Sequence, residues 1–164
     1  MNFEVGKEHP WCDHGQLFFF SIFIIGWALD SFVFHWSVFF VGPINLVSRI
    51  ILSTLCFIIG ISIENGSKKV LLNQVNPDPH IIDYGVFRFV RHPVYLGVLV
   101  ILLGLFFWSF SLISLIILSV FFLFYDKMAS YEEEDFTRIF GEEYSRYKKK
   151  VRKWIPKVRV RMIF

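Results

Sequence analysis

The sequence predicts an all-α integral membrane protein with four transmembrane helices and a cytosolic amphipathic helix near its C-terminus. Hydrophobic residues make up 55% of the chain, and 21 of its 164 residues are phenylalanine. Average soluble chains are about 45–50% apolar, and long runs without charge are typical of membrane-spanning helices. We therefore expect one membrane domain over residues 1–164.

The first predicted span covers residues 17–40 and contains two ionisable residues, Asp30 and His35. Ionisable groups are costly in hydrocarbon, so each is expected either to face a partner or to lie near the far membrane surface. The sequence leaves both possibilities open. Glycine and proline in Val41-Gly42-Pro43 predict a turn, and a second span follows over residues 44–63.

The longest apolar run, Val94 to Tyr125, predicts a helical hairpin. It contains 32 consecutive uncharged residues. A single helix of that length would extend about 48 Å, whereas the hydrocarbon core is about 30 Å thick. Two spans, over residues 93–108 and 110–126, with a turn near Trp108-Ser109-Phe110-Ser111, cross the membrane twice instead.

The distribution of basic residues favours four spans. With that topology, all of the 17 lysines and arginines except Arg49 lie on one side of the membrane. The positive-inside rule then places both termini in the cytoplasm, together with the polar segments 64–92 and 127–156. Arg49 lies near the start of the second span, where its long side chain can reach the interface.

The C-terminal segment has an aromatic stripe and a basic end. Its aromatic and aliphatic residues recur at steps of three and four, which predicts an amphipathic helix that Gly141 can bend; they are Phe136, Phe140, Tyr144, Tyr147, Val151 and Trp154. A basic segment next to a membrane is typical of binding to anionic lipid, so we expect this for the tail at 157–164. No nucleic-acid-binding motif accompanies the charge, and we expect no nucleic-acid partner.

The N-terminal tail contains four residues of types that bind metals, but no metal site is expected there. The spacing of His9, Cys12, Asp13 and His14 matches no closed zinc pattern, and no second pair of ligands follows. A solvated tail is the better interpretation.

Two charged clusters flank the predicted hairpin and should meet at one membrane surface. Before it stands Arg91-His92-Pro93, where proline suits the first turn of a helix whose free N–H groups favour an anion. Arg91 adds a planar cation that matches a carboxylate. Glu132 and Glu133 follow the hairpin. A ligand with a carboxylate and positive groups would suit this arrangement, although an ordinary flank of solvated charges is an equally open alternative.

The chain resembles the superfamily of isoprenylcysteine carboxyl methyltransferases and phospholipid methyltransferases. The segment from Gly85 to Gly97, with its Arg-His-Pro-x-Tyr-x-Gly pattern, is similar to the first signature of that superfamily. The second signature is similar to Glu132-Glu133 and the residues that follow them, namely Phe136, Phe140-Gly141, Tyr144, Tyr147 and Ile155-Pro156. The two signatures have the expected order and are separated by a predicted hairpin. The Gly-x-Gly cofactor signature of the phospholipid N-methyltransferases is not evident.

The resemblance implies an S-adenosylmethionine-dependent enzyme that acts at the cytosolic membrane face on lipophilic acceptors from the bilayer. It implies that six residues bind the cofactor: Arg91, His92, Tyr95, Gly97, Glu132 and Glu133. A carboxylate acceptor needs only an orienting cation, Arg88 or Arg91. An amine or thiol acceptor must lose a proton, and either a glutamate or His92 could assist that step. We therefore expect Arg91, Glu133 and Arg88 to act in catalysis.

The acceptor expected first is an isoprenylcysteine-type carboxylate, and a phospholipid amine or a small thiol is the alternative. Two other functions remain open. One is a nicotinamide-dependent lipid or sterol reductase of similar architecture, whose related motif usually continues as Tyr-x-Gly-Glu; here Val98 follows Gly97. The other is a membrane scaffold without enzymatic activity. The sequence does not indicate an oligomeric state.

Overall fold

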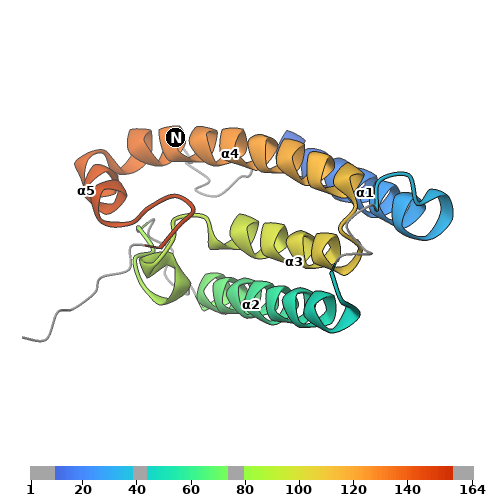
Figure 1. Ribbon diagram of the computed structural model, residues 1–164. Helices are drawn as coiled ribbons and strands as arrows, with labels where there is room; N and C mark the ends of the chain where they lie inside the picture. The colour runs from blue at the N-terminus through green and yellow to red at the C-terminus, as the bar shows by residue number, and fades with distance from the viewer. Residues whose placement is uncertain (1–9, 39–43, 74–79, 157–164) are drawn as a thin grey trace, which may run out of the picture.

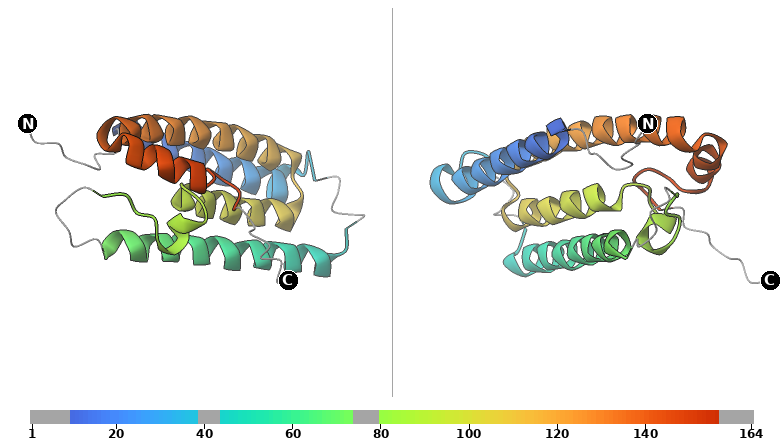
Figure 2. Two further views of the ribbon diagram at one scale, coloured as in Figure 1. Left: turned by 90° about the vertical axis from the view of Figure 1, so that its left-hand side faces the viewer. Right: turned by 180° about the vertical axis from the view of Figure 1, so that it is seen from behind.

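A computed structural model describes residues 10–38, 44–73 and 80–156, and its regular elements there are helices arranged in two layers (Figures 1 and 2). One layer pairs α2 with α3, and the other pairs α4 with α1, while α5 folds back at the end of α4. The bounds are Pro10–Ala28 for α1, Leu46–Leu72 for α2, Pro93–Ser109 for α3, Leu112–Phe140 for α4 and Glu142–Lys150 for α5. The all-α class is confirmed.

Glycines hold α2 and α3 together along their length. A Cβ atom built on Gly97 would lie 3.1 Å from the carbonyl oxygen of Gly60, and one on Gly104 would lie 3.2 Å from that of Ser53. Side chains at these positions would push the two backbones apart. Small residues at such crossings let membrane helices approach closely, so this pair forms a tight unit.

The predicted hairpin is confirmed. Pro93 stands in the first turn of α3, and the helix ends before Phe110, which has a left-handed backbone with φ of 48°. Ser111 then caps α4, because its Oγ accepts a hydrogen bond of 3.1 Å from the N–H of Ser114. The turn therefore falls at residues 110–111, within the predicted stretch.

Three of the described helical segments are long and apolar enough to cross a membrane: His14–Phe34, α2 and α4. The fourth predicted span corresponds to α3, which has 17 residues and is shorter. Large apolar side chains on α1 and α2 are exposed, among them Phe18, Leu55 and Ile58. Such extensive apolar exposure is stable against lipid and unfavourable in water. The protein is an integral membrane protein.

Two helices continue past the predicted ends of their membrane spans into the polar segments. The segment 64–92 is not a loop from its start, since α2 runs on to Leu72. Likewise α4 continues to Phe140, and the chain breaks at Gly141, whose φ is 56°. The aromatic stripe is therefore divided between α4, α5 and a non-helical end. The Val41-Gly42-Pro43 turn, the tail at 157–164 and the side chains of the N-terminal tail before His14 lie outside the described residues.

Asp30 links the N-terminal helix to the start of α4. It lies in the wider π-helical turn η1 (Leu29–Phe34) and is only 2% exposed. Its carboxylate accepts hydrogen bonds from the N–H and Oγ of Ser37 and from the Oγ of Ser111. Trp27, one turn earlier, donates its indole N–H to the carbonyl of Leu105 over 2.9 Å. Asp30 therefore faces partners, which is one of the two possibilities that the sequence left open.

We expect Asp30→Ala to lower the apparent free energy of unfolding by about 2–4 kcal/mol. Two hydroxyls and one N–H lose a charged acceptor, and each such bond contributes about 1.5–3 kcal/mol, with incomplete additivity. Unfolding by SDS titration in mixed micelles measures the effect. Ser119→Ala is the control, since the exposed Ser119 hydroxyl bonds only to the Leu115 carbonyl of its own helix. Equal stability of the two variants would contradict the role of Asp30.

Candidate functional site

The start of α3 is held against the end of the chain. The backbone N–H of Arg91 donates to the carbonyl of Arg152 over 3.0 Å, and Val90 forms an isolated parallel bridge with Arg152. We call residues 151–156 the C-terminal strap. Figure 1 shows this segment returning from α5 towards the beginning of α3. Residues about 60 positions apart are thus joined directly.

Arg91 connects three elements with one side chain. Its Nε donates to Oε1 of Glu133 over 2.8 Å, and its Nη1 donates to the carbonyls of Lys148 and Val151. The side chain is 11% exposed and its partner Glu133 is 7% exposed. A buried pair of this kind needs further hydrogen bonds to offset its desolvation. Arg91 donates them to backbone carbonyls of the strap and of α5. Arg91 therefore fixes the position of the C-terminal segment.

Glu133 is the centre of a cluster of positive groups. Besides Arg91, it contacts Nζ of Lys148 at 3.0 Å and Nε2 of His92 at 3.2 Å. Three potential cations, two from the residues just before α3 and one from α5, thus surround one carboxylate of α4. Sequence reasoning did not find Lys148, because it lies within a run of three lysines of which the other two are exposed.

His92 lies between two carboxylates and is buried. Its Nδ1 is 3.3 Å from Oε2 of Glu132, while Nε2 faces Glu133. Burial lowers the pKa of His92, but the hydrogen bonds and negative charges of the two glutamates outweigh it, so the pKa is raised above 6.5. With an acceptor beside each nitrogen, the doubly protonated imidazolium is the favoured form.

Tyr95 extends the cluster into the apolar layer. Its hydroxyl donates to Oε1 of Glu132, and its ring stacks on that of Tyr125 with centroids 4.5 Å apart. The ring of His92 is also nearly parallel to that of Tyr95, with centroids 5.9 Å apart. A continuous stack therefore leads from the charged cluster to the core between α3 and α4.

The C-terminal strap is anchored by Asp126, the first charged residue after the apolar run. Its Oδ1 accepts from Nζ of Lys153 over 2.7 Å and from the indole N–H of Trp154 over 2.8 Å. The indole ring lies against His92, with centroids 6.1 Å apart. Sequence reasoning missed Asp126 and treated Trp154 as part of a helical stripe, because no local pattern joins positions 28 residues apart.

The structure brings five of the predicted residues together: Arg91, His92, Tyr95, Glu132 and Glu133. It leaves two others apart. Gly97 lies against the backbone of Gly60 and Glu64, so its small size serves the packing of α2 on α3. Arg88 is exposed on the short helical turn η3 (Gly85–Arg88). Gly97 therefore permits the close approach of α2 to α3.

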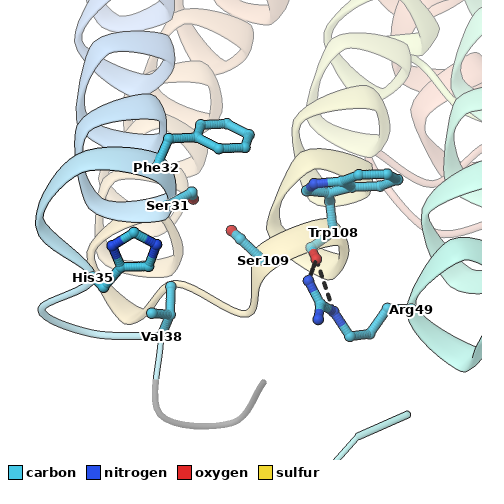
Figure 3. A pocket seen from close by; sticks show the side chains of 7 residues that line it. All are labelled: Ser31, Phe32, His35, Val38, Arg49, Trp108 and Ser109. Carbon is cyan, nitrogen blue, oxygen red and sulfur yellow. Dashed lines mark hydrogen bonds between the residues drawn. The ribbon is translucent and has the colours of Figure 1, made fainter. Parts of the chain in front are cut away.

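A separate hollow lies at the opposite end of the helices (Figure 3). It is lined by Ser31, Phe32, His35, Val38, Arg49, Trp108 and Ser109, and its volume is about 180 Å³. Sites for small-molecule ligands usually have about 300–1,000 Å³. Arg49 there donates to the carbonyl of Trp108. The hollow is small and distant from the charged cluster, so we do not assign the chemistry to it.

His92 should make the stability of the protein depend on pH. Because its pKa is raised in the folded state, its contribution is complete below about pH 6.5, the unfolded value, and is lost as pH rises through the folded pKa. The difference in unfolding free energy between the wild type and His92→Gln should therefore shrink as pH rises above about 6.5. SDS titrations at several pH values measure it.

Glu134→Gln serves as the control for this experiment. Glu134 is the exposed neighbour of Glu133 on α4. This variant should keep the pH dependence of the wild type. A stability difference between the wild type and His92→Gln that stays constant over the whole range would contradict the arrangement of His92 between two carboxylates.

Comparisons with known proteins agree with the motifs. The model of the family described as phospholipid methyltransferase matches residues 46–143, from the start of α2 into α5. A curated protein from Schizosaccharomyces pombe, named protein-S-isoprenylcysteine O-methyltransferase, is 30% identical over 88 residues. That alignment covers 53% of this chain and 37% of the relative, so the chain spans little more than a third of the relative's length. No solved structure matches.

The family match extends over more than half of the chain and includes both charged clusters, Arg91-His92 and Glu132-Glu133. It confirms the resemblance seen in the motifs. The chain belongs to the phospholipid methyltransferase family, a family of membrane methyltransferases.

Proposed function

We propose that the protein transfers a methyl group from S-adenosylmethionine to a lipophilic acceptor at the cytosolic membrane face. The observation that carries the proposal is the buried cluster of Arg91, His92, Glu132 and Glu133 at the mouth of the α3–α4 hairpin. Its two halves come from the two signatures of the family, and they meet where a polar cofactor and an apolar acceptor can approach from different phases.

The residues of this end of the molecule suit that cofactor chemically. Its carboxylate, ammonium and sulfonium call for both signs of charge in a partly dry site. Glu132 is partly exposed beside the buried pair, and Arg91 and Lys148 supply positive charge. The buried hydroxyl of Tyr125 has no hydrogen-bond partner among the described residues, which leaves a polar group for a ligand. We propose Arg91, His92, Tyr95, Glu132 and Glu133 as the cofactor-binding residues.

When bound, S-adenosylmethionine supplies a methyl group on a positively charged sulfur, and transfer forms a bond from the acceptor to that carbon while the sulfur–carbon bond breaks to give a neutral thioether. The protein contributes position and exclusion of water. Arg91 and Glu133 fix the strap, and Trp154 then covers His92. Because Arg91 donates its hydrogen bonds to Glu133, α5 and the strap, Arg88 is the cation better placed to orient an acceptor carboxylate from the exposed turn η3.

An isoprenylcysteine-type carboxylate is the first proposed acceptor. The related yeast protein is named for an isoprenylcysteine, and the exposed apolar faces of α1 and α2 suit a substrate with a tail in lipid. A phospholipid amine is the second candidate, and the description of the matching family model favours it. The family match supports neither the reductase nor the scaffold interpretation.

We further propose four spans with both termini in the cytoplasm. At a rise of about 1.5 Å per residue, α3 extends about 25 Å, close to the shortest helix that crosses a bilayer. The charged cluster joins the ends of α3 and α4 with α5, so these segments share one side of the membrane. Arg49 lies at the other end of α2.

The topology is tested with single cysteines in a chain whose Cys12 and Cys56 are replaced by serine. Asn73→Cys and Lys150→Cys, at the ends of α2 and α5, should react with an impermeant maleimide from the same side. Asn45→Cys, at the other end of α2, should react from the opposite side. Labelling of positions 73 and 150 from different sides would contradict the topology.

The activity is tested with labelled S-adenosylmethionine in nanodiscs that contain a farnesyl-cysteine analogue, phosphatidylethanolamine or a short-chain thiol. We expect transfer to the farnesyl-cysteine carboxylate, with little change in rate above about pH 6 from ionisation of the acceptor, since carboxyl pKa values are about 3–4. Transfer to the amine or thiol would instead rise with pH. Transfer only to a soluble polar acceptor, or to none, would contradict the proposal.

The cofactor site is tested by binding rather than by turnover. Glu132→Gln should weaken S-adenosylmethionine binding by about tenfold or more, because a hydrogen bond to a charged group contributes about 1.5–3 kcal/mol. Glu134→Gln, on the exposed face of the same helix turn, is the matched control and should bind normally. Calorimetry that finds equal affinity in both variants would mean that the cofactor binds elsewhere.

A further inference from the structure

The hydroxyl of Tyr125 is a buried polar group without an observed purpose. The residue is 1% exposed, and its hydroxyl has no hydrogen-bond partner among the described residues. An unpaired buried hydroxyl costs about 1–3 kcal/mol, and native proteins pair nearly all such groups. Tyr125 is the last residue of the apolar run of α4, next to Asp126, and its ring stacks on that of Tyr95. A ligand that reaches the charged cluster would therefore meet this hydroxyl.

A carboxylate of α2 lies close to the same place. Glu64 packs directly against Gly97 of α3, where a Cβ atom built on the glycine would be 3.3 Å from Cβ of Glu64. Gly97 is two residues after Tyr95, so Glu64 lies beside the first turns of α3, which also carry the stack of Tyr95 on Tyr125. The side chain of Glu64 is 24% exposed and forms a salt bridge with Lys68, a largely exposed residue one turn further along α2. The close glycine packing thus brings a negative charge to the wall of the core.

The charges around this point favour a positive ligand. Glu64 supplies a carboxylate, Tyr95 bonds to the carboxylate of Glu132, and both tyrosine oxygens have lone pairs. The basic residues of the cluster, Arg91, His92 and Lys148, are already paired with Glu132 and Glu133. In surroundings of low polarity, a carboxylate interacts strongly with a nearby cation, and aromatic rings add to the attraction.

We propose that Glu64 and Tyr125, beside Tyr95, bind the positive charge of an onium group, that is, a sulfonium or an ammonium. The inference rests on the proposed methyltransferase function and deepens it. Two sources of this charge are possible: the sulfonium of S-adenosylmethionine and the ammonium of an amino-lipid acceptor. Both share the chemistry that the site recognises, and they are distinguished by the ligands in which the effect of a substitution is seen.

The first arm of the test compares S-adenosylmethionine with S-adenosylhomocysteine, which lacks the methyl group and has a neutral sulfur. Affinities are measured by calorimetry on the full chain in nanodiscs. If the site binds the sulfonium, Glu64→Gln should weaken binding of the charged ligand by about tenfold and leave that of the neutral one within about twofold. Tyr125→Phe, which keeps the ring stack, should lower the same ratio by a smaller factor.

The second arm compares acceptors. If the site binds an acceptor ammonium, both variants should keep the affinity ratio of the two cofactor forms. They should instead raise KM for phosphatidylethanolamine about tenfold, without an equal change for the farnesyl-cysteine carboxylate. Either pattern supports the inference and names the source of the charge.

Matched controls come from the same helix, α4. Tyr131→Phe removes the hydroxyl of an exposed tyrosine, and Asp135→Asn removes an exposed carboxylate that pairs with Arg138. Neither control should alter charge discrimination. If the wild type binds S-adenosylmethionine but Glu64→Gln and Tyr125→Phe change neither the affinity ratio nor the relative KM values, this inference alone is overturned. If the wild type binds neither cofactor form, the proposed function is overturned, and this inference with it.

Discussion

The ion pair between Arg91 and Glu133 is the interaction on which the end of the molecule with the charged cluster depends. Its two residues lie 42 positions apart, on opposite sides of the hairpin, and both are largely buried. Removing either partner would leave a charge without compensation, which usually costs about 3–5 kcal/mol. Because Arg91 also bonds to the backbone of α5 and the strap, the pair joins α4, α5 and the strap at one point.

The apolar part of the molecule supports this pair by rigid packing. Close contact at Gly60 and Gly97 fixes α2 against α3, and the aromatic core around Phe23 and Phe121 fixes α1 against α4. Membrane helices gain little from the hydrophobic effect once they are in lipid, so close van der Waals contact and buried hydrogen bonds decide their arrangement. The hydrogen bonds of Asp30 supply the second kind of contact, at the end of the helices far from Arg91.

The C-terminal strap packs against the charged cluster at the start of α3. Asp126 holds both Lys153 and Trp154, and the indole of Trp154 lies over His92. The strap thus returns to the start of α3, and the apolar sides of the helices stay exposed.

The sequence by itself determined the class of the protein, its helical hairpin and its family. These properties follow from local signals: a run of uncharged residues too long for one span, a proline at a helix start, and two motifs in a fixed order. The conjunction of Arg91, His92, Tyr95, Glu132 and Glu133 was also predictable, because a hairpin must return the chain to the surface from which it started.

Only the tertiary structure decided which atoms pair. It turned Gly97 towards α2, left Arg88 on the surface, and gave Asp30 partners from Ser37 and Ser111. It also added Asp126, Lys148, Glu64 and Tyr125 to the residues of interest. The physical reason is that hydropathy and helix signals act within a few residues, whereas hydrogen bonds and ion pairs depend on separations of a few ångströms between side chains far apart in sequence. The sequence also did not indicate that α2 and α4 continue past the predicted span ends at residues 63 and 126, because polar residues end a membrane span without ending a helix.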